Sequence, residues 1–158
     1  MAFEEPQPDQ KVQIYPGAYI KALRAHGATL PEGVRFIAQS EWYFDPTDHR
    51  CPHDSWLDSF TIRDEVADDE TRARKMSLSL RLLGAYHDGH IELTYPGAHR
   101  YLLNGPKKVR TGRRWHEDWI TDTIHMLENG LVEQKIWFDS DAVWEIVAED
   151  IKYRWIPL

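Results

Sequence analysis

The sequence predicts a mainly β fold of the α+β class. One short N-terminal helix precedes an antiparallel meander that forms a curved sheet, a sandwich or a partly closed barrel. Three observations predict this class. Apolar and polar residues alternate with period two in several short segments. Asp-Gly and Asn-Gly pairs follow some of these segments. Turn signals recur about every 8 to 15 residues, a spacing typical of antiparallel sheets.

The length and composition predict one domain. The chain has 158 residues, of which 42% are apolar and 28% charged, as is typical of a single globular domain. Residues 1–11 hold two prolines and three acidic residues, so we expect a flexible tail there and a single β-rich domain over residues 12–158. No segment approaches the run of about 20 apolar residues that spans a membrane. The acidic start does not fit a secretory signal, and Cys51 is the only cysteine. We therefore expect a cytoplasmic protein.

The first elements are expected to be a helix and three strands. Pro16 is a favourable first residue for a helix, apolar residues then recur at helical spacing, and Gly27 ends the pattern. This predicts a helix over residues 16–26. Period-two alternation predicts the strands that follow, with a charged connection at residues 64–74, over residues 34–44, 56–62 and 76–82.

A hairpin is predicted around the Asp-Gly pair at residues 88–89. Asp-Gly between two alternating segments is the strongest short-range hairpin signal. A two-residue turn there places Tyr86 opposite Ile91 and Leu82 opposite Tyr95, which brings the apolar residues onto one face. Beyond a loop at residues 104–114, further strands are expected over residues 101–103, 120–126, 131–138, 143–148 and 151–155.

Charge and missing motifs favour protein binding over catalysis. The chain holds 26 acidic and 19 basic side chains, a net charge of −7, which opposes the attraction to phosphates that drives nucleic-acid binding. It contains no phosphate-binding loop, dinucleotide-binding glycine motif, serine-nucleophile motif or zinc-protease motif. A net charge of this size often serves solubility alone. The functional alternative, which we predict, is a non-enzymatic module with no cofactor that binds a basic protein. Its interface is expected to include Asp64, Glu65, Asp68, Asp69, Glu70 and Trp137, with Asp139, Asp141 and Glu149 extending the acidic surface.

Trp137 enters this interface because the alternation places it on the strand face that carries Glu133 and Lys135. An exposed tryptophan on a sheet face is a typical interface anchor. The alternative is that Trp137 covers an open sheet edge or packs under the N-terminal helix.

A basic loop offers nucleic-acid binding as an alternative function. Five basic residues lie within eight positions and precede a tryptophan. Such side chains can hold a nucleic-acid backbone while a base stacks on the ring. The net acidic charge of the chain disfavours this function, and the loop could equally contact an acidic patch on another protein or on a second copy. The residues concerned are Lys107, Lys108, Arg110, Arg113, Arg114 and Trp115.

Histidine-rich segments offer a metal-dependent enzyme as a further alternative. Two histidines and a cysteine at every second position place three ligating side chains on one side of an extended chain. Two more histidines flank the predicted turn and would face each other about 5 Å apart. A complete site requires the two segments to fold together. The candidate ligands are His49, Cys51, His53, His87 and His90, with Asp88 beside the turn.

Residues 115–119 combine aromatic, acidic and imidazole side chains. In a cleft, Glu117 or Asp118 could act as a general acid or base with His116 as its partner. The same segment also fits the rim of a sheet, where the tryptophans cover the edge and the acids face water.

The order of elements resembles a family of small bacterial β-rich proteins, some of which are similar to immunity proteins of polymorphic toxin systems. The resemblance covers about residues 53–155 and leaves the first helix and strand outside it. It implies a cytoplasmic protein that binds and blocks a cognate toxin, with no catalytic residues to carry over. The segments that carry it are His53-Asp54-Ser55, the alternating residues 77–83, Ile91-Glu92-Leu93-Thr94-Tyr95, the strand at Tyr101, Gly130-Leu131-Val132-Glu133, Ile136-Trp137-Phe138, Trp144-Glu145-Ile146-Val147 and Glu149-Asp150-Ile151.

Overall fold

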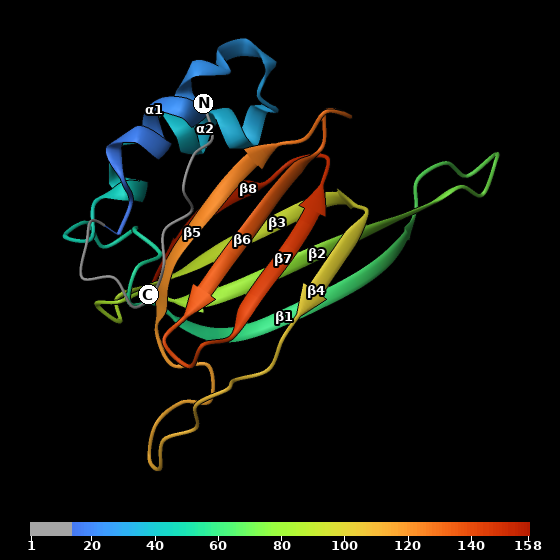
Figure 1. Cartoon of the computed structure of the whole chain (residues 1–158). Helices are drawn as coiled ribbons and strands as arrows, with labels where there is room; N and C mark the ends of the chain where they lie inside the picture. Colours follow the sequence, from blue (N-terminus) through green and yellow to red (C-terminus); the bar gives the residue numbers. More distant parts are fainter. Residues whose placement is uncertain (1–13) are drawn as a thin grey trace.

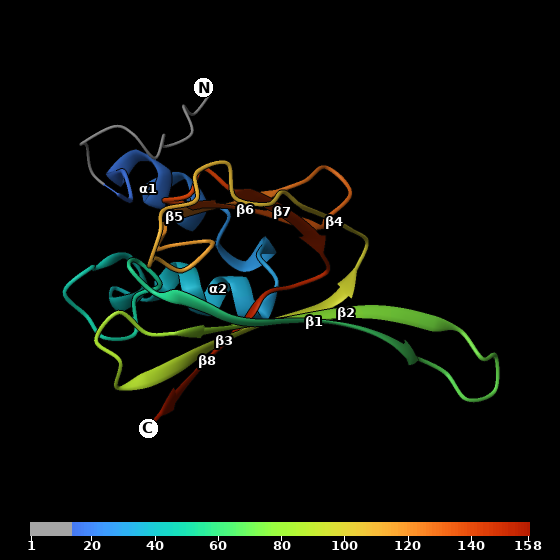
Figure 2. The same ribbon diagram turned by 90° about the horizontal axis from the view of Figure 1, so that it is seen from below.

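The computed structural model describes residues 14–158, so the tail predicted at residues 1–11 lies outside the described residues. Within the described part, eight strands form two four-stranded antiparallel sheets. The sheets lie as two layers, with the helices gathered at one end of them (Figures 1 and 2). The predicted mainly β fold is confirmed, as two stacked sheets that do not close into a barrel. No helix among residues 14–158 is long and apolar enough to cross a membrane.

The first sheet shows the alternation that the sequence predicts. Leu78, Leu80 and Leu82 are buried, whereas Ser79 and Arg81 between them remain partly accessible. Side chains that point alternately into the core and toward solvent are the property of a half-buried strand. In the order of their pairing the strands are β1 (Trp56–Val66), β2 (Arg74–Leu83), β3 (Gly89–Ala98) and β8 (Lys152–Pro157).

The second sheet contains the remaining strands, in the order β4 (Arg100–Leu103), β7 (Val143–Ala148), β6 (Val132–Phe138) and β5 (Trp119–Met126). Consecutive strands pair as an antiparallel meander in β1–β2–β3 and again in β5–β6–β7. The chain changes layers twice. It passes from β3 to β4, and it returns from β7 to β8, which pairs with β3.

The predicted register of the hairpin at residues 88–89 is wrong by four residues. Leu82 pairs with Ile91 and Tyr95 pairs with Leu78. The turn is longer than two residues because the N–H of Gly84 donates to the carbonyl of Gly89 at 2.9 Å. A shift by an even number of residues leaves every side chain on its original face. The apolar face of the two strands was therefore predicted correctly although the pairing was not, and Tyr86, which was expected on that face, is exposed in the turn.

The helix expected over residues 16–26 forms as α1 (Gly17–Ala25), but the strand expected over residues 34–44 is wrong. That segment forms a second helix, α2 (Glu32–Gln39), followed by a single 3-10 turn at Trp42–Phe44. Val34, Ile37 and Ala38 are the buried positions of α2, and their spacing of three and four residues is that of one helix face.

A remote carboxylate holds the N-terminus of α2. Asp150, just before β8, accepts hydrogen bonds from the N–H groups of Gly33 at 2.9 Å and Val34 at 3.1 Å. These are donors that the helix itself cannot satisfy. A Cβ atom at residue 33 would overlap the carbonyl oxygen of Ile151, so glycine permits this close approach.

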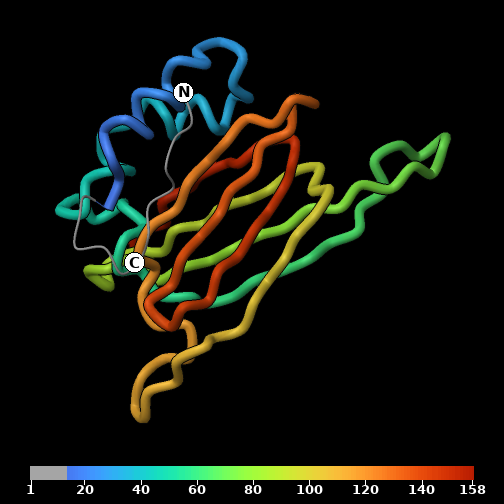
Figure 3. Tube along the Cα trace, in the orientation of Figure 1, coloured from blue at the N-terminus to red at the C-terminus, as the bar shows by residue number. Residues whose placement is uncertain are grey.

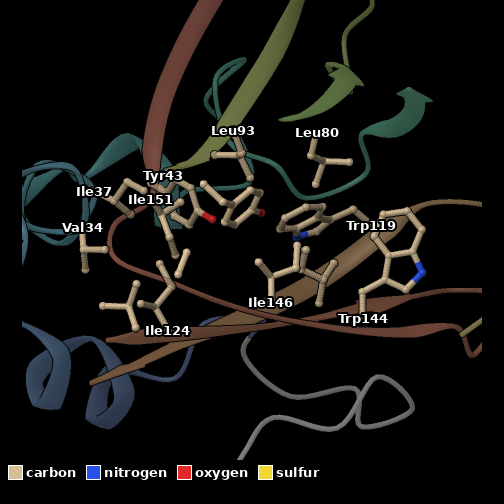
Figure 4. Packing of buried hydrophobic residues seen from close by; sticks show 14 of the residues in the cluster. Val34, Ile37, Tyr43, Leu80, Leu93, Trp119, Ile124, Trp144, Ile146 and Ile151 are labelled. Atoms are coloured by element: carbon tan, nitrogen blue, oxygen red, sulfur yellow. The ribbon is translucent and has the colours of Figure 1, made fainter. Parts of the chain in front are cut away.

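One hydrophobic core joins both sheets to the helices. Side chains from α2, from the two sheets and from the segment before β8 meet in the space between the layers (Figure 4). Two segments leave this body in different directions, as the Cα trace shows (Figure 3). One is the far end of the β1–β2 hairpin and the other is the connection between β4 and β5. Both contain residues that the sequence marks as functional candidates.

Candidate functional site

The far end of the β1–β2 hairpin, residues 62–75, is called the arm here. β1 and β2 remain paired from Trp56↔Leu83 out to Val66↔Arg74, and every residue of the arm is exposed. Figures 1 and 2 both show it extending beyond the two layers. The arm therefore presents both of its faces to solvent on a pair of hydrogen-bonded strands.

The five acidic residues predicted for the interface all lie on the arm, and none of them makes an ion pair among the described residues. The side chain of Asp68 orders the tip, because its Oδ1 accepts a hydrogen bond from the N–H of Glu70 at 2.8 Å. Of the neighbouring basic residues, Lys75 pairs with Glu149 at 3.2 Å. The five acids of residues 64–70 are thus unpaired, although the arm also carries the basic residues Arg63, Arg72 and Arg74, so its charge is mixed and only slightly negative overall.

Two exposed apolar side chains, called the apolar strip below, lie on one face of β1 on either side of Asp64: Ile62 and Val66. Ile62 and Val66 have the strand parity of Phe60, whose ring contacts Trp144 in the core with centroids 5.5 Å apart. Ile62 is nevertheless 44% exposed, since the opposite sheet does not cover it. An exposed apolar strip bordered by charge is the usual composition of a protein–protein interface.

Trp137 does not belong to this surface, and the prediction of an exposed Trp137 is wrong. It is 7% exposed. It lies on β6, opposite Thr121 of β5 and Val143 of β7, and Thr121 is buried as well. The outer face of the second sheet is therefore covered at this point, and Trp137 is inaccessible to a partner.

The connection between β4 and β5, residues 104–118, is called the loop end. The carbonyl of Ser140 accepts hydrogen bonds from the N–H groups of Lys107 and Lys108, both at 2.9 Å. The ammonium of Lys108 also pairs with Asp141 at 3.1 Å. The loop that carries the basic run is thus attached to the β6–β7 turn.

Most of the basic side chains predicted to bind nucleic acid contact groups of the chain itself. The guanidinium of Arg110 lies between two carboxylates, and that of Arg114 stacks over the Trp56 ring at 4.6 Å. The Trp56 indole in turn donates to Asp118 at 2.7 Å. Arg113 has no ion pair among the described residues. The positive charge of the loop is thereby largely compensated, and this weakens the nucleic-acid hypothesis.

Acidic groups converge behind this loop. Burial raises the pKa of the Asp54 carboxyl, His53 lowers it, and the charges of Asp118 and Asp139 raise it further. Burial also lowers the pKa of His116, which favours a neutral imidazole at neutral pH. The carboxylates are therefore close enough to influence one another.

Glu117 is the most unusual member of this group. Its side chain is 2% exposed, and neither carboxylate oxygen accepts a hydrogen bond within residues 14–158. The nearest cation, Nη1 of Arg110, lies 3.8 Å from Oε2 and 3.7 Å from Oδ2 of Asp139. The residue is held at φ 55°, a conformation that few residues other than glycine adopt. Glu117 lines a pocket of about 250 Å³ together with Leu57, Arg114, Trp115 and His116.

The predicted metal ligands disperse over the structure. His49 and Asp88 do meet, with Nδ1 to Oδ2 at 2.5 Å, and the imidazole stacks on Tyr86. His87 instead contacts the Trp56 ring, and His90 pairs with Leu83 across the sheet rather than with His87. No group of three or more His, Cys, Asp or Glu side chains in residues 14–158 is placed to hold a metal ion.

The other two predicted ligands are engaged elsewhere. The ring of His53 contacts the carbonyl oxygen of Ile120 at 2.7 Å and the carboxylate of Asp54 at 3.3 Å. Cys51 is buried with its Sγ 3.0 Å from the carbonyl oxygen of Tyr43. Burial raises the pKa of this thiol to about 12. The thiol therefore remains protonated at neutral pH, whereas metal binding requires the thiolate.

Sequence reasoning missed a buried polar network around Asp122. The carboxylate accepts hydrogen bonds from Tyr15 at 2.7 Å, Tyr43 at 2.9 Å and the amide of Gln134 at 2.8 Å. Tyr95 completes the network by donating to the Gln134 oxygen. Burial raises the pKa of Asp122, and these donors oppose the rise. Every oxygen of the carboxylate is satisfied, so the network ties the N-terminal segment to both sheets.

A signal for this network was present in the sequence. Asp122 has the same strand parity as Ile120, Ile124 and Met126, which places an acid at a core-facing position. A buried acid requires hydrogen-bond donors.

Comparison of the chain with known protein families, with curated proteins and with solved structures finds no match.

Proposed function

We propose that the chain is a non-enzymatic, cytoplasmic protein-binding module of the immunity type, which neutralises a basic toxin by binding it through the arm. The observation that carries this proposal is the set of five exposed acidic residues on the arm, none of which is paired with a base among the described residues. Because complementary charge accelerates encounter and disfavours wrong partners, such a surface suits a basic ligand.

The apolar strip supplies what charge alone does not. Ile62 and Val66 offer area that a partner can remove from water, and buried apolar area contributes roughly 25 cal/mol per Å². Charge would then determine the rate of association, and the strip would prolong the complex. The β1 side of the arm is also an edge of its sheet, because β1 is the outermost strand in the order β1-β2-β3-β8, so a partner can approach this side of the arm without displacing another strand of the sheet.

In the first experiment the tagged chain is expressed in its source cells and purified, and the protein that co-purifies with it is identified. The expected partner is basic, arrests growth when it is expressed alone, and does so no longer when the chain is co-expressed. A partner that is acidic, or that is harmless when expressed alone, would contradict the proposal.

A charge-reversal series then locates the interface. Glu65→Lys, Asp69→Lys and Glu70→Lys are combined, and Asp68 is retained because it orders the tip. We expect association to slow about tenfold or more at low salt and the difference to shrink at high salt. The matched control reverses three exposed acids away from the arm, Glu32, Glu41 and Glu128. Equal slowing by both triple variants would show that net charge, and not the arm, guides the partner.

A further inference from the structure

The pocket at the loop end contains an unmet demand for hydrogen-bond donors. Both oxygens of Glu117 are buried without a donor among the described residues. A buried carboxylate in this state is costly, since burial removes its hydration and no hydrogen-bond donor among the described residues replaces it. The backbone at Glu117 is strained as well, because its φ is positive.

One cationic group, the guanidinium of Arg110, already lies near this carboxylate. Arg110 approaches Glu117 to 3.8 Å and Asp139 to 3.7 Å, but its guanidinium donates no hydrogen bond among the described residues. The side chain of Arg110 is half exposed, so it can move aside. Arg114 also lines the pocket, but its guanidinium is held on the ring of Trp56 and makes no ion pair with Glu117 among the described residues. Arg110 thus contacts Glu117 loosely from outside the pocket lining and leaves both carboxylate oxygens without a hydrogen bond among the described residues.

The walls of the pocket suit a flat cation. Trp115 is 66% exposed and presents an aromatic ring, and His116 adds a second ring, which its lowered pKa leaves neutral. A guanidinium is planar, stacks on aromatic faces and donates two parallel hydrogen bonds to a carboxylate. An ammonium offers neither the plane nor the paired donors.

We infer that the Glu117 pocket binds a guanidinium group, which donates to both oxygens of Glu117 while it stacks on Trp115. Arg110 then turns toward Asp139. The guanidinium can come from a free small molecule or from an arginine side chain of a protein. The site lies on the loop end and does not involve the arm, so it stands or falls independently of the proposed function.

The test titrates the ¹⁵N-labelled full chain with N-acetyl-arginine amide and follows the indole resonances. The isosteric control ligand is N-acetyl-citrulline amide, in which a neutral urea replaces the guanidinium. We expect saturable shifts with the arginine compound and none with the citrulline compound. Equal responses to both, or no saturable shift with either, would overturn the inference.

Two variants separate binding from folding. Glu117→Gln removes the charge at constant size and should weaken binding about tenfold or more, whereas Glu128→Gln, the same change at an exposed position, should not. Because the Glu117 oxygens accept no hydrogen bond among the described residues, the melting temperature of Glu117→Gln should equal or exceed that of the wild type. A lower melting temperature with unchanged binding would assign Glu117 a purely structural role. Should Glu117→Gln fail to fold, Trp115→Ala at the exposed rim provides the second variant, and unchanged binding there would contradict the stacking.

The source of the guanidinium is decided by a capped Gly-Gly-Arg-Gly-Gly peptide. If the guanidinium belongs to a protein side chain, the peptide should bind at least as tightly as the single residue. If it belongs to a free small molecule, the peptide should bind more weakly. The Glu65, Asp69 and Glu70 variant should bind both ligands like the wild type, which keeps this result apart from the test of the arm.

Discussion

Removing one hydroxyl from the Asp122 network should measurably destabilise the protein. The change is Tyr43→Phe, which retains the buried ring and deletes only the oxygen. That hydroxyl donates to Asp122 at 2.9 Å and accepts from the amide of Gln134 at 3.4 Å. Burial, followed by the charge of Asp122, raises the pKa of Tyr43 well above its ordinary value, so the hydroxyl remains a donor at neutral pH.

The magnitude follows from what the carboxylate loses. Asp122 keeps Tyr15 and Gln134 as donors, so its carboxylate loses one hydrogen-bond donor and retains the others. A hydrogen bond to a charged group contributes about 1.5–3 kcal/mol. For a chain of this size that loss lowers the melting temperature by about 3 to 12 °C.

Urea unfolding followed by circular dichroism, together with calorimetry, measures both quantities. Tyr101→Phe is the control, because Tyr101 is exposed and its hydroxyl makes no hydrogen bond within the described residues. The control should change the free energy of unfolding by less than about 0.5 kcal/mol. If Tyr43→Phe were as mild as Tyr101→Phe, the network would be contributing nothing, and the reasoning would be refuted.

Two further predictions concern packing and pH. Gly33→Ala should cost about 1–3 kcal/mol, because the new Cβ overlaps the carbonyl of Ile151. Gly105→Ala, where nothing lies within 4 Å of the new Cβ, should be nearly neutral; equal unfolding free energies would show that α2 moves freely away. Asp122→Asn tests the raised pKa of that carboxyl. A folded-state pKa above the unfolded one means that stability falls as pH rises from the ordinary pKa through the raised value. The unfolding free energy of the wild type minus that of Asp122→Asn should therefore decrease across this pH range, and an increase would mean that the hydrogen-bond donors outweigh burial.

The sequence predicted the strands of both sheets, but it predicted a further strand over residues 34–44, where the helix α2 forms. Leu78, Leu80 and Leu82 alternate with polar residues because only one face of their strand meets the core, and that pattern is legible without a structure. Residues 34–44 contain apolar residues at spacings that fit either period. The helix α2, which includes the first part of this segment, is stabilised at its N-terminus by Asp150, more than one hundred positions away.

The candidate sites divide in the same way. The acidic run at residues 64–70 is exposed because charged side chains remain hydrated, so its place on the surface could be predicted. The prediction of Trp137 as an exposed anchor failed because burial of that face depends on what covers the second sheet. Glu117 was considered as an acid or base from its neighbours in the chain. Nothing local indicated that it would be buried without a donor.

What the sequence determined by itself is the sheet content, the faces of the strands and the concentration of negative charge, because each depends on contacts within a few residues. What the tertiary structure decided is the second helix, the division of the strands into two layers with β8 returning to pair with β3, the donors around Asp122 and the pocket at Glu117. Each of these depends on groups far apart in the chain whose meeting is set by the closure of the core. Local periodicity records which side of a strand is apolar, but not which distant carboxylate or hydroxyl it will meet there.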